Sequence, residues 1–226
     1  MSKSNNLANT EHLAKTYKQL SSIEHVLLKP DTYVGSVDKD EITCWTMEND
    51  KMITKTFNAI PALYKCFDEG IVNARDQYIR MLSKFSQDAY VNVVVKNIKV
   101  TIEDNSKITI FNDGNGIDVA KHPENDMWIP EMIFGHMRTS TNYNDEEKKI
   151  TGGKNGFGFK LVLIFSKWGS IETHDHIRGL TYTQEFKNNL SEICKPTIRK
   201  NKSKKPYTKV SWIPDYSRFG CEKGWF

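Results

Sequence analysis

The chain has 226 residues, of which 38% are hydrophobic and 11% aromatic, enough to close the core of one large domain. Its net charge of +4 arises from 32 basic and 28 acidic residues, which differs from the strong basic stripe of a dedicated DNA-binding domain. No apolar run approaches the roughly 18 residues that a membrane helix needs, and residues 1–15 lack the apolar centre of a secretory signal. We therefore expect an intracellular protein without membrane contact.

The first part of the chain predicts a polar arm, a loop and a hairpin. Residues 1–24 are too polar to form a core of their own, which is typical of an arm. Pro30 and Gly35 interrupt the segment 25–37, so it is expected to be an ordered loop rather than a helix. Residues 38–58 are expected to form a short hairpin.

A long amphipathic helix is expected to begin at Pro61 and to continue through Leu82. Its apolar residues recur at spacings of three and four, which aligns them on one helix face. These residues are Leu63, Phe67, Ile71, Ala74 and Tyr78.

The remaining segments predict an α+β fold in which helices are layered on one face of a mostly antiparallel, mixed sheet. A helix is expected at about 127–137, and a second, buried helix at 161–168, directly after a glycine-rich loop. The β-rich runs alternate with short polar turns, so a meander is expected in the middle of the chain. The expected strands are 91–95, 99–103, 107–112, 169–175, 180–186 and 208–213.

The long helix carries a polar face beside its apolar one. Glu69, Asn73 and Asp76 stand at i, i+4 and i+7 and therefore share this face. A carboxylate can orient or deprotonate a water molecule, and an amide oxygen is a ligand that suits Mg²⁺. For any single member of the trio, a solvated polar edge is the better interpretation. Together they predict a helix that supplies a general base and a metal ligand four residues apart.

The sequence Asn112-Asp113-Gly114-Asn115-Gly116 follows a predicted strand. Asn, Asp and Gly are turn residues for conformational reasons, so a simple turn is one interpretation. The other is a nucleotide site, because a carboxylate can accept a hydrogen bond from an adenine amino group. The flanking glycines would allow a planar base to approach closely.

The glycine loop has the spacing G-x-x-G-x-G, with Gly153, Gly156 and Gly158. It is neither a Rossmann fingerprint nor a Walker A loop, whose glycine spacings differ. Because the loop runs into an apolar helix, its free backbone N–H groups would face an anion, and Lys154 and Lys160 would add positive charge. A flexible surface loop is the alternative, and phosphate binding is favoured over it.

Two other features carry less functional weight. The basic segment 199–205 is interpreted as a solvated loop between strands, with a nucleic-acid or phosphate contact as the minority interpretation. The four cysteines form no CxxC pair, which argues against a zinc site and a disulfide framework. They are Cys44, Cys66, Cys194 and Cys221.

The acidic-amide helix, the turn at 112–116 and the glycine loop occur in an order that resembles the Bergerat ATP-binding fold. This is the fold of the GHKL superfamily, which holds type II topoisomerases, MutL repair proteins, heat-shock chaperones and histidine kinases. Over roughly residues 14–220 the sequence is similar to the eukaryotic-type topoisomerase II family of type IIA DNA topoisomerases. The similar segments are EHVLLKPDTYVGSV, LYKCFDEGIVNARD, IPEMIFGHMRTSTNYNDEEKKITGGKNGFGFKLVLIFS and WIPDYSRFG.

The resemblance implies an ATPase that uses ATP and Mg²⁺. Glu69 would be the general base, and Asn73 would bind Mg²⁺ and the phosphates. Asn112 and Asp113 would hold the adenine side. The ribose and phosphates would be lined by Ser140, Thr141 and Asn142, and the triphosphate would be wrapped by Gly153, Lys154, Asn155, Gly156, Phe157, Gly158, Phe159 and Lys160.

The resemblance also implies an organisation and partners. An N-terminal arm (1–24) would precede an ATPase domain (25–220) and the start of a linker to a transducer (221–226). ATP binding would favour a homodimer in which Tyr17 of the partner subunit touches the nucleotide, although a frayed terminus is an equal alternative. Closure of the dimer would form a gate for double-stranded DNA, handled by the full-length enzyme in the nucleus or at a cytoplasmic replication site.

Several positions depart from the family pattern. Asp118 stands where proline is usual, so a looser turn is expected there. Gly70 replaces a large aliphatic residue and is expected to cost the helix roughly 1 kcal/mol relative to alanine. Arg75 and Phe159 replace small residues, and Arg75 would either contact phosphate or point outward. Thr141 replaces serine and keeps the hydroxyl.

Full-length members of the family continue into a transducer, whose lysine touches the terminal phosphate, and into DNA-cleaving parts that this chain lacks. Nucleotide binding with weak hydrolysis is therefore expected of the chain by itself. The alternatives are another GHKL ATPase, of the MutL or chaperone type, and a nucleotide-gated interaction module without hydrolysis.

Overall fold

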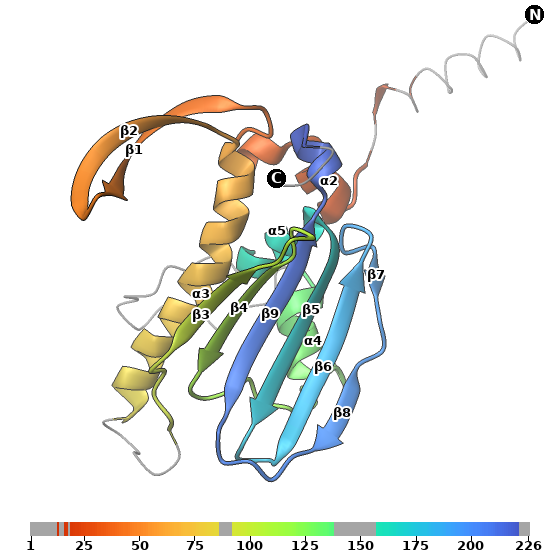
Figure 1. Cartoon of the computed structure of the whole chain (residues 1–226). Helices are drawn as coiled ribbons and strands as arrows, with labels where there is room; N and C mark the ends of the chain where they lie inside the picture. Colours follow the sequence, from red (N-terminus) through yellow and green to blue (C-terminus); the bar gives the residue numbers. More distant parts are fainter. Residues whose placement is uncertain (1–12, 14–15, 18, 86–91, 138–156, 222–226) are drawn as a thin grey trace, which may run out of the picture.

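The computed structural model describes residues 13, 16–17, 19–85, 92–137 and 157–221. It has two layers, an antiparallel sheet and the helices that cover one of its faces (Figure 1). No helix in the described part is both long and apolar enough to cross a membrane. The layered α+β arrangement predicted from the sequence is therefore confirmed.

The sheet has the strand order β3-β4-β9-β5-β6-β7, and β8 also pairs with β6. Every pairing among its described strands is antiparallel, so the mixed character expected from the sequence is absent from them. The strands are β3 (Ile98–Ile102), β4 (Ile108–Asp113), β5 (Ser166–Asp175), β6 (Leu180–Lys187), β7 (Glu192–Ile193), β8 (Thr197–Lys200) and β9 (Tyr207–Pro214).

The chain enters the fold through a short helix, α2 (Ser22–Leu28), and a 3₁₀ turn, η1 (Pro30–Thr32). Ser21 and Glu24 form a reciprocal capping box, with the Ser21 N–H donating to Glu24 Oε2 at 2.8 Å. The predicted loop at 25–37 was therefore wrong for its first residues, because this cap and the buried Val26 establish a helix that ends before Pro30.

A hairpin formed by β1 (Asp40–Glu48) and β2 (Lys51–Ala59) projects from the body of the molecule (Figure 1). Its two-residue turn places Asn49 at φ 50° and Asp50 at φ 59°. Positive φ at both positions is the requirement of a tight hairpin turn, and Asn and Asp tolerate it. The predicted hairpin is confirmed.

The long helix α3 (Pro61–Phe85) lies against the sheet at β4, and its Gly70 faces Ile110 of β4 and Trp212 of β9. A Cβ atom added to Gly70 would lie 2.8 Å from Ile110 Cδ1 and 3.2 Å from the Trp212 ring. Because Gly70 has no side chain, the helix can pack directly on Ile110 and Trp212. Helix propensity alone does not reveal this gain in packing. Trp212 in turn meets Phe159 edge to face, with ring centroids 5.4 Å apart.

The segment before β3 is a correction to the predicted meander. Residues 92–97 are not a strand, because their backbone groups bond to Asp113 at the end of β4 and to Asn115 in the turn that follows it. The N–H of Asn115 donates to the Val93 carbonyl at 2.9 Å, and the N–H of Asp113 to the Asn97 carbonyl at 3.2 Å.

The second buried helix begins three residues earlier and ends four residues earlier than predicted. Helix α4 (Ile129–Gly135) lies within its predicted range, but α5 (Gly158–Ile164) ends before β5 begins at Ser166. Ser166 Oγ donates to the Val162 carbonyl at 2.6 Å, and Asn189 Nδ2 to the Ile164 carbonyl at 2.8 Å. These side chains satisfy the last helical carbonyls, whereas a fully apolar run alone does not distinguish helix from strand.

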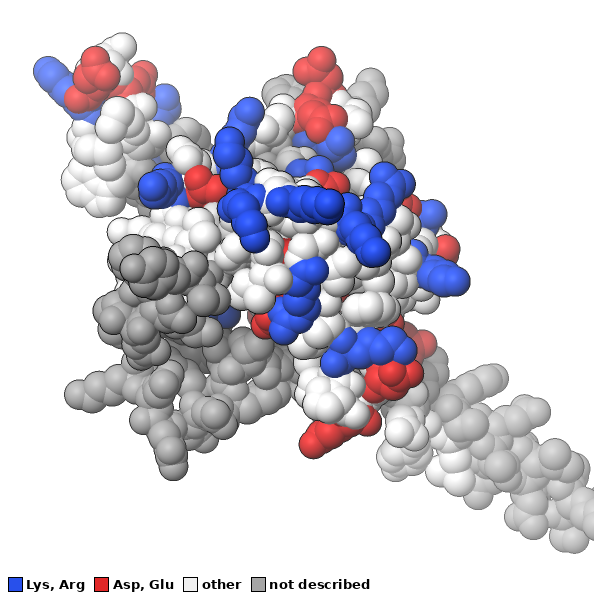
Figure 2. Space-filling model, turned by 90° about the horizontal axis from the view of Figure 1, so that it is seen from below, with Lys and Arg blue, Asp and Glu red and all other residues white. Residues whose placement is uncertain are grey.

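The basic segment 199–205 is only partly a loop. Arg199 and Lys200 belong to β8, and a loop at 201–206 then leads into β9. This region lies at the lower end of the sheet in Figure 1, where lysine and arginine side chains gather when the molecule is viewed from below (Figure 2).

Gly70 and Phe159 both contact Trp212, so we expect substitutions at the two positions to be energetically coupled. Gly70→Leu should overpack the interface and cost about 1–3 kcal/mol of unfolding free energy. Phe159→Ala should cost about 3–5 kcal/mol through the cavity it leaves. The double variant should lose less than the sum, by about 0.5–3 kcal/mol in a urea-unfolding cycle. Additive losses would contradict the coupling.

Candidate active site

The polar face of α3 meets the start of α5 at Gly158. A Cβ atom built on Gly158 would lie 3.2 Å from Glu69 Oε2 and 3.7 Å from Asn73 Nδ2. Glu69 is partly buried and Asn73 is exposed, so a carboxylate and an amide border the same accessible space. Two motifs separated by about 85 residues of sequence are therefore brought into contact where the glycine loop ends.

Lys65 holds the Glu69 carboxylate from one turn earlier on α3. Its Nζ lies 2.8 Å from Glu69 Oε1 and 2.9 Å from Asp68 Oδ2. The bond to Glu69, followed by the contact with Asp68, raises the pKa of Lys65. The ion pair fixes one oxygen of Glu69, and the other oxygen is the one that faces Gly158.

Strand alternation separates Asn112 from Asp113, which the sequence grouped together. Asn112 is buried on the helix-covered face, in line with Ile108 and Ile110. Asp113 points to the opposite face, where Oδ1 accepts from the N–H groups of Lys96 and Asn97 at 2.6 and 2.8 Å. Burial raises the pKa of Asp113, but these hydrogen bonds outweigh it and hold the pKa below its ordinary value. Asp113 is thus not brought together with Glu69 and Asn73.

The turn after β4 is held to α3 by Gln77, a residue that the sequence reasoning missed. Gln77 Nε2 donates to the Asn115 carbonyl at 2.8 Å. It stands one turn after Asn73 on α3, and this i+4 spacing was the available signal. The same turn is pressed against β5 at Gly116, where a Cβ atom would overlap the His174 carbonyl. The acidic-amide helix, the turn at 112–116 and the end of the glycine loop are therefore all positioned by contacts with α3 or with the strands beneath it.

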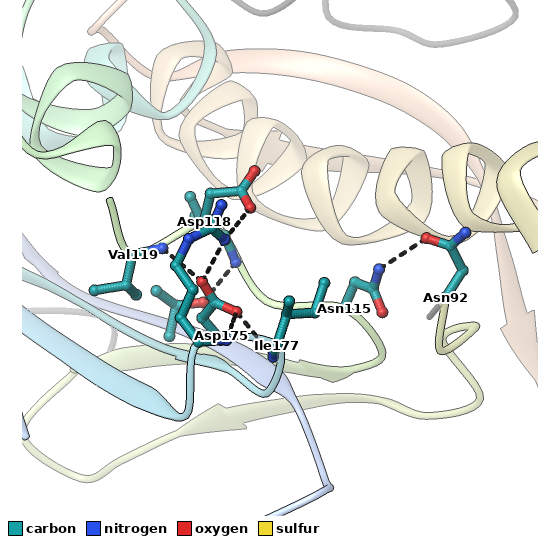
Figure 3. A network of polar contacts seen from close by, with 9 residues as sticks. Asn92, Asn115, Asp118, Val119, Asp175 and Ile177 are labelled. Carbon is teal, nitrogen blue, oxygen red and sulfur yellow. Dashed lines mark hydrogen bonds and ion pairs between the residues drawn. The ribbon is translucent and has the colours of Figure 1, made fainter. Parts of the chain in front are cut away.

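Asp175 anchors the far side of this turn (Figure 3). Its carboxylate accepts the N–H of Val119 at 2.9 Å, the N–H groups of Ile177 and Arg178 at 3.0 Å, and Arg178 Nη1 at 2.8 Å. Arg178 also pairs with Asp118. A looser turn was expected at Asp118, and its carboxylate joins a network that a proline would lack.

The start of α5 is positioned by the N-terminal segment. Phe157 meets the ring of Tyr33 edge to face at 6.2 Å, and the Tyr33 hydroxyl lies 3.0 Å from His25 Nδ1. Lys160 is buried two residues after Gly158, and burial lowers its pKa to about 8.

The structure does not describe every predicted site residue. Arg75 is exposed, and its guanidinium pairs with the buried carboxylate of Asp76 at 3.3 Å. Tyr17 is 76% exposed, and its N–H donates to the Leu13 carbonyl at 2.8 Å. Predicted positions outside the described residues are Ser140, Thr141, Asn142, Gly153, Lys154, Asn155 and Gly156.

The described part of the chain has no group of three or more His, Cys, Asp or Glu residues able to hold a metal ion. An all-protein metal cage is therefore not available there. Mg²⁺ can also bind with few protein ligands, because it keeps several waters and is held largely by substrate phosphates. The Asn73 amide beside the Glu69 carboxylate fits this second way of binding Mg²⁺.

Comparisons with known proteins identify first the class and then the family. No family model matches the chain. The structure superposes on the 43K ATPase domain of Thermus thermophilus gyrase B with a TM-score of 0.60 at 19% identity, covering 91% of this chain and 42% of that one. At that identity the likeness establishes the fold alone, which is the GHKL ATPase fold.

The family follows from closer relatives. The sequence is 44% identical over 212 residues to DNA topoisomerase 2 of Candida albicans, covering 92% of this chain and 14% of that protein. The ATPase region of Saccharomyces cerevisiae topoisomerase II superposes with a TM-score of 0.85 at 42% identity, covering 93% of this chain and 53% of that one. The chain belongs to the eukaryotic DNA topoisomerase II family and corresponds to its ATPase region. It spans about one-seventh of the length of such curated relatives.

The hydrogen bonds that Asp175 accepts from Val119, Ile177 and Arg178 should contribute to the free energy of unfolding in a pH-dependent way. Burial raises the pKa of Asp175, but the bonds from Arg178 and Val119 outweigh it and lower the pKa below 3.8. Asp175→Asn should cost about 1–3 kcal/mol of unfolding free energy near neutral pH. Its charge stabilises the fold above the unfolded pKa, and this contribution is lost as pH falls through the folded pKa. The difference from the parent chain should therefore shrink in acid.

Urea unfolding of both proteins between pH 7 and pH 3 measures this difference. The matched control is Asp126→Asn, which removes an exposed pair with Lys121 and should change stability by less than about 0.5 kcal/mol. Equal losses for the two variants, or a loss for Asp175→Asn that is constant with pH, would contradict the assignment.

Proposed function

We propose that this chain binds ATP with Mg²⁺ between α3, the turn at 112–116 and the start of α5, and hydrolyses it. The observation that carries the proposal is the approach of Gly158 to Glu69 and Asn73. A residue without a side chain at that point leaves room for phosphate oxygens beside a carboxylate and an amide. The family assignment supports ATP as the nucleotide, since the yeast relative is described as an ATPase region.

In this proposal Glu69 positions the attacking water and accepts its proton. The water oxygen forms a bond to the γ-phosphorus as the bond to the β,γ-bridging oxygen breaks, releasing ADP and phosphate. Lys65 is a positioning residue, because its 2.8 Å ion pair holds Glu69 with the second carboxylate oxygen directed at Gly158. A restrained carboxylate loses less freedom when it aligns the water.

Asn73 is the residue proposed to hold Mg²⁺, through its side-chain oxygen. The ion, when bound, supplies positive charge that neutralises the phosphates. Lys160 would add a second cation from within the fold, since a triphosphate favours its charged form and opposes the effect of burial on its pKa. On the adenine side, Asn112 is the better candidate than Asp113, because only Asn112 lies on the helix-covered face.

Further proposals concern the larger protein. Residues 1–24 would form a dimer arm that precedes the ATPase domain at 25–220, and Tyr17 of the partner subunit would touch the nucleotide across a homodimer. Its exposed side chain in this chain is compatible with such a role. ATP would favour the dimer through linkage, because a ligand that binds the dimer better stabilises it. In the full-length enzyme, dimer closure would gate double-stranded DNA inside a DNA-handling compartment.

A nucleotide-gated binding module without hydrolysis is the second candidate function. It is favoured if Glu69 cannot reach a water molecule, for example because Lys65 engages its carboxylate permanently. Single-turnover hydrolysis by the chain distinguishes the two functions, since a pure binding module has no hydrolysis to lose.

Glu69→Gln should lower the single-turnover hydrolysis rate by at least about 100-fold and leave ATP-analogue affinity within about threefold, since glutamine keeps the shape but cannot take the proton. The matched control is the adjacent Asp68→Asn, which also contacts Lys65 but does not face Gly158. Its hydrolysis rate should stay within about threefold of the parent. Equal losses in both variants would assign the effect to Lys65, and no loss in Glu69→Gln would remove the general-base role.

A further inference from the structure

The loop at 201–206 is an ordered part of the sheet rather than a loose connection. Asn201 donates from its backbone to the Gly179 carbonyl at 2.8 Å and from Nδ2 to Thr181 Oγ1 at 2.9 Å. The fully buried His174 lies beneath the loop, with Nε2 2.8 Å from the Ser203 carbonyl. The backbone of this loop, from which its lysine side chains extend, is therefore held in place relative to the strands.

This loop and the neighbouring strand ends concentrate positive charge. We call the group the basic end, and Figure 2 shows the face on which it lies. All its members are exposed, and none forms an ion pair with an acid among the residues that the structure describes. The members are Lys96, Lys99, Arg199, Lys200, Lys202, Lys204 and Lys205.

The acidic side chains near the basic end are already engaged by the fold. Asp113 accepts three hydrogen bonds from residues 96–97, and Asp175 with Asp118 binds Arg178. Glu172 pairs with Lys209 at 3.0 Å and accepts from Tyr207 Oη at 2.9 Å. These carboxylates are therefore bound within the fold, and the positive charge of the basic end is available to an external anion.

The basic end also borders a hollow on the sheet face that no helix covers. Its volume is about 580 Å³, and Lys99 and Lys205 line it together with Asp113, whose carboxylate is bound by residues 96–97. Phe111 and Tyr207 lie in its wall, with ring centroids 5.6 Å apart. An open, basic hollow with an apolar wall suits a polymer that presents phosphates next to sugars, and an extended set of cations suits a polymer better than a single small anion.

We propose that the basic end is a contact surface for the sugar–phosphate backbone of duplex DNA. The contact would be independent of sequence, because lysines provide charge without the fixed geometry that reads base edges. The surface lies on the sheet face opposite to Glu69, Asn73 and Gly158, so DNA and nucleotide would occupy separate sites. The choice of DNA among polyanions rests on the proposed function as part of a DNA topoisomerase.

The test is fluorescence anisotropy of a short labelled duplex titrated with the 226-residue chain over a range of salt concentrations. The test variant is Lys202→Gln/Lys204→Gln/Lys205→Gln. The control is Lys29→Gln/Lys39→Gln/Lys51→Gln, which removes the same charge from exposed positions on the N-terminal segment and the hairpin. Two duplexes of unrelated sequence, a single-stranded RNA and anionic phosphatidylserine vesicles complete the set of probes.

We expect the test variant to bind duplex at least about tenfold more weakly at low salt and to reduce the salt slope by up to about 2.7. The control should change by less than about twofold, and both duplexes should bind alike. Equal losses in the two variants would show a net-charge effect and overturn the site. Tighter binding of RNA or vesicles than of duplex would overturn DNA as the occupant.

Binding of an ATP analogue by the same proteins separates this inference from the proposed function. Retained nucleotide binding in a test variant with weakened DNA binding supports two independent sites. Nucleotide binding without any DNA binding by the parent chain overturns the DNA surface alone. DNA binding without nucleotide binding overturns the proposed function and leaves the surface in place.

Discussion

The structure depends on how closely α3 can approach the sheet, and Gly70 sets that distance. With no side chain at this position, the helix rests directly on Ile110 and Trp212. From the same helix, Glu69 and Asn73 reach Gly158 at the start of α5, and Gln77 holds the turn after β4. A larger residue at position 70 would push these three side chains away from their partners together, because they share one rigid helix.

The strand β4 then divides the protein into two faces with different chemistry. Asn112 lies under the helices, where the nucleotide is proposed to bind, and its neighbour Asp113 is used to fix residues 96–97 on the bare face. That face ends in the basic loop at 201–206, which His174 supports from within the sheet. Successive side chains of β4 therefore lie on opposite faces of the sheet, one covered by helices and the other bare.

Sequence patterns predicted those parts of the fold in which periodicity and burial agree. The apolar spacing of α3 and the alternating strands near the end of the chain are long enough to be unambiguous. The short apolar run at 91–95 was misassigned over its described residues 92–95, because Val93 forms its backbone hydrogen bonds with Asn115 in the turn after β4. Gly70 was expected to weaken the helix, but propensity does not include the Ile110 and Trp212 contacts that require a glycine.

The candidate site was predictable only as a set of motifs. The order of the three motifs indicated which segments would meet, whereas the separation of Asp113 from Asn112 depends on strand register, and the role of Asp118 depends on Arg178, 60 residues away in sequence. Lys65 and Gln77 flank the acidic-amide motif at i±4 on the same helix, so their contacts follow from helical spacing once the motif is located.

The most direct measurement of the central claim is titration calorimetry of the chain with a non-hydrolysable ATP analogue and Mg²⁺. It compares the parent with Asn73→Ala and with Asn58→Ala, an exposed amide on the β2 strand of the hairpin. If α3 and Gly158 form the nucleotide site, the parent and Asn58→Ala bind alike and Asn73→Ala loses binding by at least about tenfold. Equal affinity of all three proteins, or no binding by the parent, would contradict the account.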